Sequence, residues 1–413
     1  MRIAMLGTRG VPARYGGFET CVEEVGSRLV AQGHDVVVYC RRAEGEPQPP
    51  EHLGMRLVHV PAVRRRSLET LSRTGLSLAH VLPRPADVAF VFNSANAPFL
   101  PALRARGVPV VTHVDGLEWQ RAKWGPTGRR YYRTAESLAV RWSDALIADA
   151  EGIADYYRSE FDADTELISY GAPLVGARPG GLTGTGLEPG GYHLVVARFE
   201  PENHVELVVE GYRRSGGRRP LVVVGSAPYA DEYTRRVHAA ADDRVRFLGG
   251  VWDQDLLDQL YAGALTYLHG HSVGGTNPSL LRAMGAGAAT TAFDVRFNRE
   301  VLREHGWYFR GPEDVARAVE ASEADPAATV RRGEGTRERA RDYDWDEVAG
   351  RYEALAERTL ARGPLRHRPS GRRRPTAAPL VRPVPAPRPA ADGVVPVAVA
   401  AVPRGGRTPR AEA

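Results

Sequence analysis

Short apolar runs of strand length alternate with helical stretches over most of this sequence. Buried parallel strands read as continuous apolar runs, and the helices between them return the chain to the start of the next strand. The first series of runs lies at 3–7, 36–40, 56–60, 88–92, 110–114 and 146–148. We therefore expect residues 1–172 to form an α/β domain built on a parallel sheet.

A second series of apolar runs predicts a second α/β domain over residues 191–343. These runs lie at 194–199, 221–225, 245–249, 265–269 and 289–293. The segment between the two series, 173–190, is rich in Gly and Pro and reads as an interdomain linker. The expected fold class is therefore α/β, with two Rossmann-like domains that face each other across a cleft.

The C-terminal part of the sequence predicts a closing helix and then a disordered tail. In the helix, expected over 344–362, Val348, Tyr352, Leu355 and Leu360 are spaced to lie on one face. Residues 363–413 contain eleven Pro, five Gly and no aromatic residue. Such a segment buries too little apolar area to offset its ordering entropy. Contact of its Arg clusters with anionic lipid headgroups is the alternative to a solvated tail.

The charge and the cysteine content exclude several classes of protein. The net charge is +5, but the tail alone has ten Arg against Asp392 and Glu412, a net of +8, so the rest of the chain is slightly acidic. The domains therefore give no reason to expect a nucleic-acid partner. Cys21 and Cys40 are the two cysteines, too few for a disulfide framework or a cysteine zinc site. No apolar run is long enough to span a bilayer. We expect a cytoplasmic protein, with peripheral contact at the inner face of the membrane as an option.

A long Gly-rich turn follows the first predicted strand and precedes a helix. Residues 7–20 read GTRGVPARYGGFET, in which Gly16 and Gly17 come just before the helix. Glycine lets a backbone approach a ligand closely, and a helix N-terminus offers N–H groups to a phosphate. A purely structural role for the turn remains open, but its length exceeds that of ordinary strand-to-helix connections.

A polar cluster closes the strand at 110–114, where open α/β sheets bind their ligands. It contains His113 and Asp115. These two residues are the catalytic candidates of the first domain. The alternative is that Asp115 caps a helix and Trp119 packs beneath it.

In the second domain, a Gly-rich turn again leads into a helix. Gly275, Thr276 and Asn277 come just before Pro278, a typical first helical residue, so this helix start is a second candidate phosphate site. His269 and His271 could share one face of an extended chain, but no third metal ligand accompanies them. The Asp-x-Asp at Asp253 opens an apolar helix and is better explained as a helix cap.

Arg198 ends the first strand of the second domain and is the expected cation at a donor phosphate. The alternative is an ion pair with Glu200 or Glu202 on the surface.

Together these segments resemble the family 4 glycosyltransferases of the GT-B fold, and in particular their bacterial rhamnosyltransferase-like branch. The resemblance covers roughly residues 1–360. The segments that carry it are 7–20, 115–125 (DGLEWQRAKWG), 168–172 (ISYGA), 197–203 (ARFEPEN) and 271–284 (HSVGGTNPSLLRAM).

The resemblance implies retaining transfer of rhamnose or another hexose from a nucleotide-sugar donor, without cofactor or metal ion. The implied acceptor is a glycan or lipid-linked glycan precursor of a cell-surface polysaccharide. Gly16, Gly17 and Arg198 would then contact the donor diphosphate. Gly275, Thr276 and Asn277 would line the donor site, and His113 and Asp115 would shape the sugar site.

The sequence departs from the family pattern at three positions. Family members usually carry two Glu where this chain has Gly274 and Arg282, and a Lys where it has Asn203. An Arg cannot accept hydrogen bonds from ribose hydroxyls as a carboxylate does, so Arg282 is a donor-site residue of altered chemistry. A catalytically weak homologue that binds a donor or a partner is therefore the main alternative. An epimerase or phosphorylase of the same fold is a further one.

Overall fold

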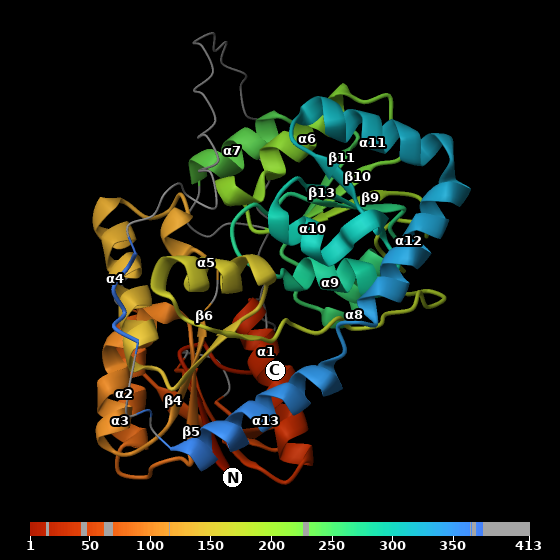
Figure 1. Ribbon diagram of the computed structural model, residues 1–413. Helices are drawn as coiled ribbons and strands as arrows, with labels where there is room; N and C mark the ends of the chain where they lie inside the picture. The colour runs from red at the N-terminus through yellow and green to blue at the C-terminus, as the bar shows by residue number, and fades with distance from the viewer. Residues whose placement is uncertain are drawn as a thin grey trace, which may run out of the picture. The chain divides into compact units, whose positions relative to one another are not determined.

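In the computed structural model, the described residues are 1–13, 16–42, 48–61, 69–114, 116–225, 231–363, 365 and 369–374. Asp115 and most of the tail therefore lie outside them. Both predicted α/β units are present (Figure 1). We call residues 1–172 the N-terminal half and residues 191–343 the C-terminal half.

The N-terminal half is built on a sheet with the strand order β3-β4-β2-β1-β5-β6-β7-β8. All neighbours are parallel except β3 and β4. The strands are β1 (Arg2–Leu6), β2 (Asp35–Arg41), β3 (Glu51–His52), β4 (Met55–Val60), β5 (Val88–Phe92), β6 (Val110–Val114), β7 (Ala145–Ala148) and β8 (Glu166–Leu167). The helices are α1 (Gly17–Ala31), α2 (Glu69–Val81), α3 (Leu100–Ala105), α4 (Pro126–Trp142) and α5 (Glu151–Phe161), with the short 3₁₀ helices η1 (Ser94–Phe99) and η2 (Glu118–Gln120).

The C-terminal half contains a parallel sheet with the order β11-β10-β9-β12-β13-β14. Its strands are β9 (His193–Val196), β10 (Leu221–Val224), β11 (Val245–Gly249), β12 (Thr266–His269), β13 (Ala289–Phe293) and β14 (Trp307–Phe309). Its helices are α6 (Val205–Arg214), α7 (Asp231–Ala239), α8 (Gln254–Ala262), α9 (Pro278–Gly285), α10 (Arg296–Leu302), α11 (Pro312–Ala324) and α12 (Pro326–Ala340), with η3 (Pro201–Asn203) and η4 (Arg303–His305). Asp253 accepts a hydrogen bond from Leu256 N at the start of α8, which confirms it as a helix cap.

The last helix, α13 (Trp345–Arg362), returns to the N-terminal half. It lies beside α1 (Figure 1) and contributes Val348, Tyr352 and Leu355 to the core around β1 and β5. Three of the four predicted apolar-face residues are therefore buried, whereas Leu360, near the end of the helix, is 38% exposed. None of the helices in the described ranges has the length and apolar content that a membrane span needs.

The start of the tail contacts the N-terminal half, so residues 369–374 do not form the solvated segment that the sequence predicted from Gly363 onward. Arg373 pairs with Glu136 of α4 and with Glu160 of α5, and Arg374 pairs with Asp162. Buried carboxylates of α4 and α5 hold this Arg-rich segment, and the low apolar content of the tail gave no sign of them. Residues 375–413 lie outside the described residues.

Candidate active site

The Gly-rich turn after β1 leads into α1 at Gly16. Gly16 has φ +128°, a conformation that side chains rarely adopt, so glycine is required there. Glu19 and Glu23 of α1 accept hydrogen bonds from the backbone N–H groups of Arg9 and Ala13 at 2.8 Å each. The helix therefore fixes the shape of the turn that precedes it.

The two predicted phosphate-binding helix starts, those of α1 and α9, lie together. A Cβ added to Gly17 would be 3.2 Å from Cγ of Pro278, the first residue of α9, and 3.6 Å from the Tyr170 ring. Both helices begin at the carboxyl end of a strand, and both point the positive end of their dipole toward the same region. The structure thus brings together two segments that are more than 250 positions apart in the sequence.

Three loops pack closely beside these helix starts. A Cβ on Gly116 would lie 2.3 Å from Cα of Gly274, and one on Gly275 would lie 1.9 Å from Oδ1 of Asp149. Thr276 Oγ1 donates a hydrogen bond of 2.6 Å to the backbone oxygen of Asp149. Asp149 follows β7, and sequence reasoning missed it, although its place after a strand of the same sheet was a usable signal.

His113 is buried among aromatic rings rather than exposed. Its ring stacks on Tyr170 and contacts the edge of Phe18, and its Nδ1 is 2.7 Å from the Tyr352 hydroxyl of α13. Burial lowers the pKa of His113 to about 3, so the imidazole is neutral at physiological pH. Phe18 and Tyr170 both neighbour Gly17, and His113 therefore supports the turn from behind. Its catalytic partner candidate, Asp115, lies outside the described residues.

Arg198 follows β9 and presents a guanidinium that no described residue binds. Among the described residues no carboxylate lies within ion-pair distance of it, so the alternative of a direct ion pair with Glu200 or Glu202 is not realised, although the charges of both act on it. Desolvation of the guanidinium and the charge of Arg121, from the N-terminal half, lower the pKa of Arg198 against the opposing effect of these carboxylates. An anion bound to the guanidinium would stabilise its positive charge and so offset the desolvation and the repulsion from Arg121.

Asn277 and Arg282 are both engaged within the C-terminal half. Asn277 caps α9 by accepting hydrogen bonds from the backbone N and the hydroxyl of Ser279. Arg282 forms an ion pair with Asp258 of α8, and about a fifth of each side chain is exposed. The guanidinium of Arg282 is thus already neutralised by a neighbouring helix.

His269 and His271 stack on each other with ring centroids 4.5 Å apart, and burial lowers the pKa of both. Within the described ranges, no three His, Cys, Asp or Glu side chains are grouped so as to hold a metal ion.

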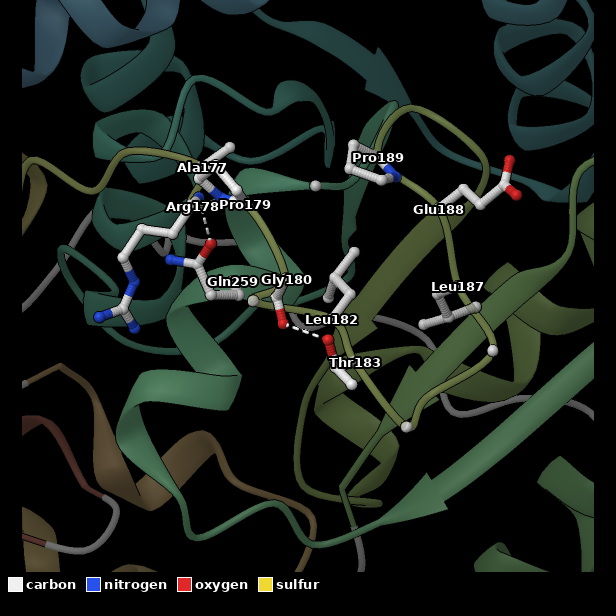
Figure 2. A pocket seen from close by; sticks show the side chains of 14 residues that line it. Ala177, Arg178, Pro179, Gly180, Leu182, Thr183, Leu187, Glu188, Pro189 and Gln259 are labelled. Atoms are coloured by element: carbon white, nitrogen blue, oxygen red, sulfur yellow. Dashed lines mark hydrogen bonds between the residues drawn. The ribbon is translucent and has the colours of Figure 1, made fainter.

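A cavity of about 690 Å³ lies elsewhere, between the linker and α8 (Figure 2). Gln259 fixes its wall by accepting a hydrogen bond of 2.7 Å from Arg178 N and donating one of 3.1 Å to Gly176 O. Its lining is mostly Gly, Pro and aliphatic residues, and none of the predicted site residues contributes to it.

Two family models match the chain, one for each half. Residues 16–171 match the glycosyl transferase 4-like domain, and residues 188–339 match the glycosyl transferases group 1 domain. Among curated proteins, glycogen synthase of Mycobacterium tuberculosis is 26% identical over 396 residues, which cover 84% of this chain and 92% of that protein. A shorter match of 120 residues, 28% identical, joins the chain to the GtfA subunit of a peptide N-acetylglucosaminyltransferase from Streptococcus gordonii and covers 28% of this chain and 23% of that protein.

Solved structures share the fold. Sucrose-phosphate synthase from Thermosynechococcus elongatus superposes with a TM-score of 0.76 at 21% identity, over 88% of this chain and all of that one. Anabaena Alr3699/HepE, solved in complex with UDP and glucose, gives a TM-score of 0.70 at 17% identity, over 86% of this chain and all of that one. With both halves matched by glycosyltransferase models, the chain belongs to the glycosyltransferases of the GT-B fold, which take their sugar from a nucleotide-sugar donor.

Proposed function

We propose that this glycosyltransferase is a retaining, metal-independent enzyme that binds the donor diphosphate beside the adjoining starts of α1 and α9. The observation that carries the proposal is the approach of Gly17 to Pro278, with the guanidinium of Arg198, which has no hydrogen-bonded partner among the described residues, in the same half as Pro278. The start of α1 supplies N–H donors, and the dipole of α9 together with one cation supplies positive charge without a metal ion.

The proposed reaction breaks the bond between the anomeric carbon and the leaving phosphate oxygen. An acceptor hydroxyl forms the new bond on the same face of the sugar, and its proton passes to the leaving phosphate. Negative charge grows on that phosphate as the bond breaks, so Arg198 stabilises the transition state more than the ground state. His113 is neutral and hydrogen-bonded to Tyr352. Its ring packs against Phe18 and Tyr170, the aromatic residues beside Gly17.

The acceptor that we propose is a glycan or lipid-linked glycan precursor, bound mainly by the N-terminal half. Such an acceptor would bring the enzyme to the inner face of the membrane as a peripheral protein. For the donor, the resemblance suggests dTDP-rhamnose, while Anabaena HepE was solved with UDP-glucose. Both belong in the first experiment.

The experiment is a thermal-shift panel of nucleotide sugars, followed by transfer assays with the donor that gives the largest shift. Selective binding raises the melting temperature in proportion to RT ln(1 + [L]/Kd). Turnover with retained anomeric configuration supports the proposal, and an inverted product contradicts it.

A catalytically weak homologue is the second candidate, because Arg282 is tied to Asp258 where family members carry a ribose-binding carboxylate. Donor binding without any transfer to glycan acceptors would favour this candidate.

A further inference from the structure

Glu202 lies at the junction of several site loops. It belongs to η3, four residues after Arg198, and its backbone oxygen accepts hydrogen bonds of 3.0 Å from both the N–H and the hydroxyl of Ser272. Ser272 precedes Gly274 and Gly275 in the loop after β12. These hydrogen bonds hold the backbone of Glu202 beside the loop that follows β12, so its carboxylate also lies near that loop.

The carboxylate of Glu202 is buried but accepts no hydrogen bond. Its side chain is 5% exposed, and neither oxygen has a hydrogen-bond donor among the described residues. The cation that faces it is Arg121 of the N-terminal half, whose Nη1 is 3.8 Å from Oε1 of Glu202. An ion pair at that distance offsets part of the desolvation cost and leaves the hydrogen-bonding capacity of both oxygens unused.

Arg121 is held in position by Glu118, a carboxylate of the N-terminal half. Its guanidinium pairs with Glu118, which also accepts Lys123 Nζ at 2.8 Å and Trp124 Nε1 at 3.3 Å. Burial raises the pKa of Glu118, but Arg121 and Lys123 together outweigh it and keep the carboxyl ionised. The position of Arg121 opposite Glu202 is therefore set before any ligand binds.

The chemistry of this arrangement selects a ligand that donates hydrogen bonds. A carboxylate repels a phosphate, so the diphosphate belongs at Arg198 and the helix starts. The next group of a nucleotide sugar after its diphosphate is the sugar ring, and its hydroxyls are donors of the kind that Glu202 lacks.

We propose that Glu202 binds hydroxyl groups of the transferred sugar and thereby helps to select the donor, with Arg121 and Glu118 as positioning residues. The proposal rests on the nucleotide-sugar donor assigned to the chain. It separates two parts of the donor: Arg198 binds the phosphates, and Glu202 binds the sugar.

The test compares the affinity for a nucleotide sugar with the affinity for its nucleoside diphosphate. Calorimetric titrations of wild type and Glu202→Gln use UDP-glucose against UDP, and dTDP-rhamnose against dTDP. Glu202→Gln is expected to weaken binding of the nucleotide sugar roughly tenfold, because hydrogen bonds to a neutral amide are weaker than those to a carboxylate. Binding of the diphosphate alone stays unchanged, which also shows that the variant is folded.

Glu200→Gln is the matched control, because it removes the same charge two residues away. It should leave the ratio of the two affinities at the wild-type value. Equal weakening of diphosphate and nucleotide sugar in Glu202→Gln would overturn the proposal, since it would mean that Glu202 acts only through Arg121 and the phosphates. Unchanged nucleotide-sugar affinity in that variant would overturn it as well. A wild type that binds none of these compounds would overturn the donor assignment and this proposal together.

Discussion

Gly17 and Pro278, the first residues of α1 and α9, lie in contact, and a single added methyl group on Gly17 would be 3.2 Å from the proline ring. Because of this approach, the size of the side chain at position 17 determines how close the two helix starts can lie. A larger side chain must push them apart or displace the turn.

Gly17→Val is therefore expected to lower kcat/KM at least about tenfold, since small displacements of positioning groups carry large kinetic costs. Gly125→Val is the control, because nothing lies within 4 Å of a Cβ at that position. Steady-state kinetics with the donor identified in the panel make the comparison. Equal rates for both variants would show that the contact does not shape the donor site.

The ion pair of Arg282 and Asp258 predicts a charge-swap result. Arg282→Glu places two carboxylates together in a partly buried setting and should cost about 1–3 kcal/mol of the free energy of unfolding. Combining it with Asp258→Arg should recover most of that loss, as a double-mutant cycle in urea denaturation would measure. If the double variant is no more stable than Arg282→Glu, the two residues are not coupled.

The contacts of the tail predict that two truncations behave differently. Removing residues 375–413 should leave the melting temperature unchanged. Removing 363–413, or making Arg373→Ala, should lower it by a few degrees, because Glu136, with a side chain only 4% exposed, loses its cation. Arg372→Ala is the control, since Arg372 is exposed and forms no ion pair among the described residues. Equal melting temperatures for the two truncations would mean that Arg373 does not hold the tail.

The buried His113 predicts a dependence of stability on pH. Its folded pKa of about 3 lies below the ordinary value of 6.5, so between those values unfolding takes up a proton and stability falls as the pH falls. Between pH 7.5 and pH 5 this histidine should account for about 2 kcal/mol of lost stability. Denaturant unfolding of His113→Gln should show a shallower pH dependence over that interval. An identical pH dependence would mean that folding does not lower the pKa of His113.

The sheet strands and the Gly-rich turns could be predicted because they depend on local patterns. Continuous apolar runs identify β1 and β5, Gly-rich stretches identify the turns before α1 and α9, and His113 is a polar residue inside the run of β6. The short edge strands β3, β8 and β14 were missed because two or three residues are too few to form a run.

Most of the contacts that define the site could not be predicted, because they join residues far apart in the chain. Tyr352 was expected only as an apolar face residue, yet its hydroxyl holds His113 from 239 positions away. The ion pair of Arg121 and Glu202 joins the N-terminal half to the C-terminal half. The ion pairs of Arg373 involve carboxylates of two different helices, Glu136 of α4 and Glu160 of α5. A single sequence does not encode such pairings in any periodic pattern.

We propose above that helix starts and Arg198 bind the donor diphosphate without a metal ion. The most direct measurement is transfer by wild type and Arg198→Ala after treatment with EDTA, with Arg178→Ala, an exposed Arg of the linker, as the control. We predict that wild type and Arg178→Ala keep full turnover, while Arg198→Ala loses roughly a hundredfold or more, the usual cost of removing a charge-stabilising group. Loss of wild-type turnover in EDTA that Mg²⁺ restores, or near-normal turnover of Arg198→Ala, would contradict the account.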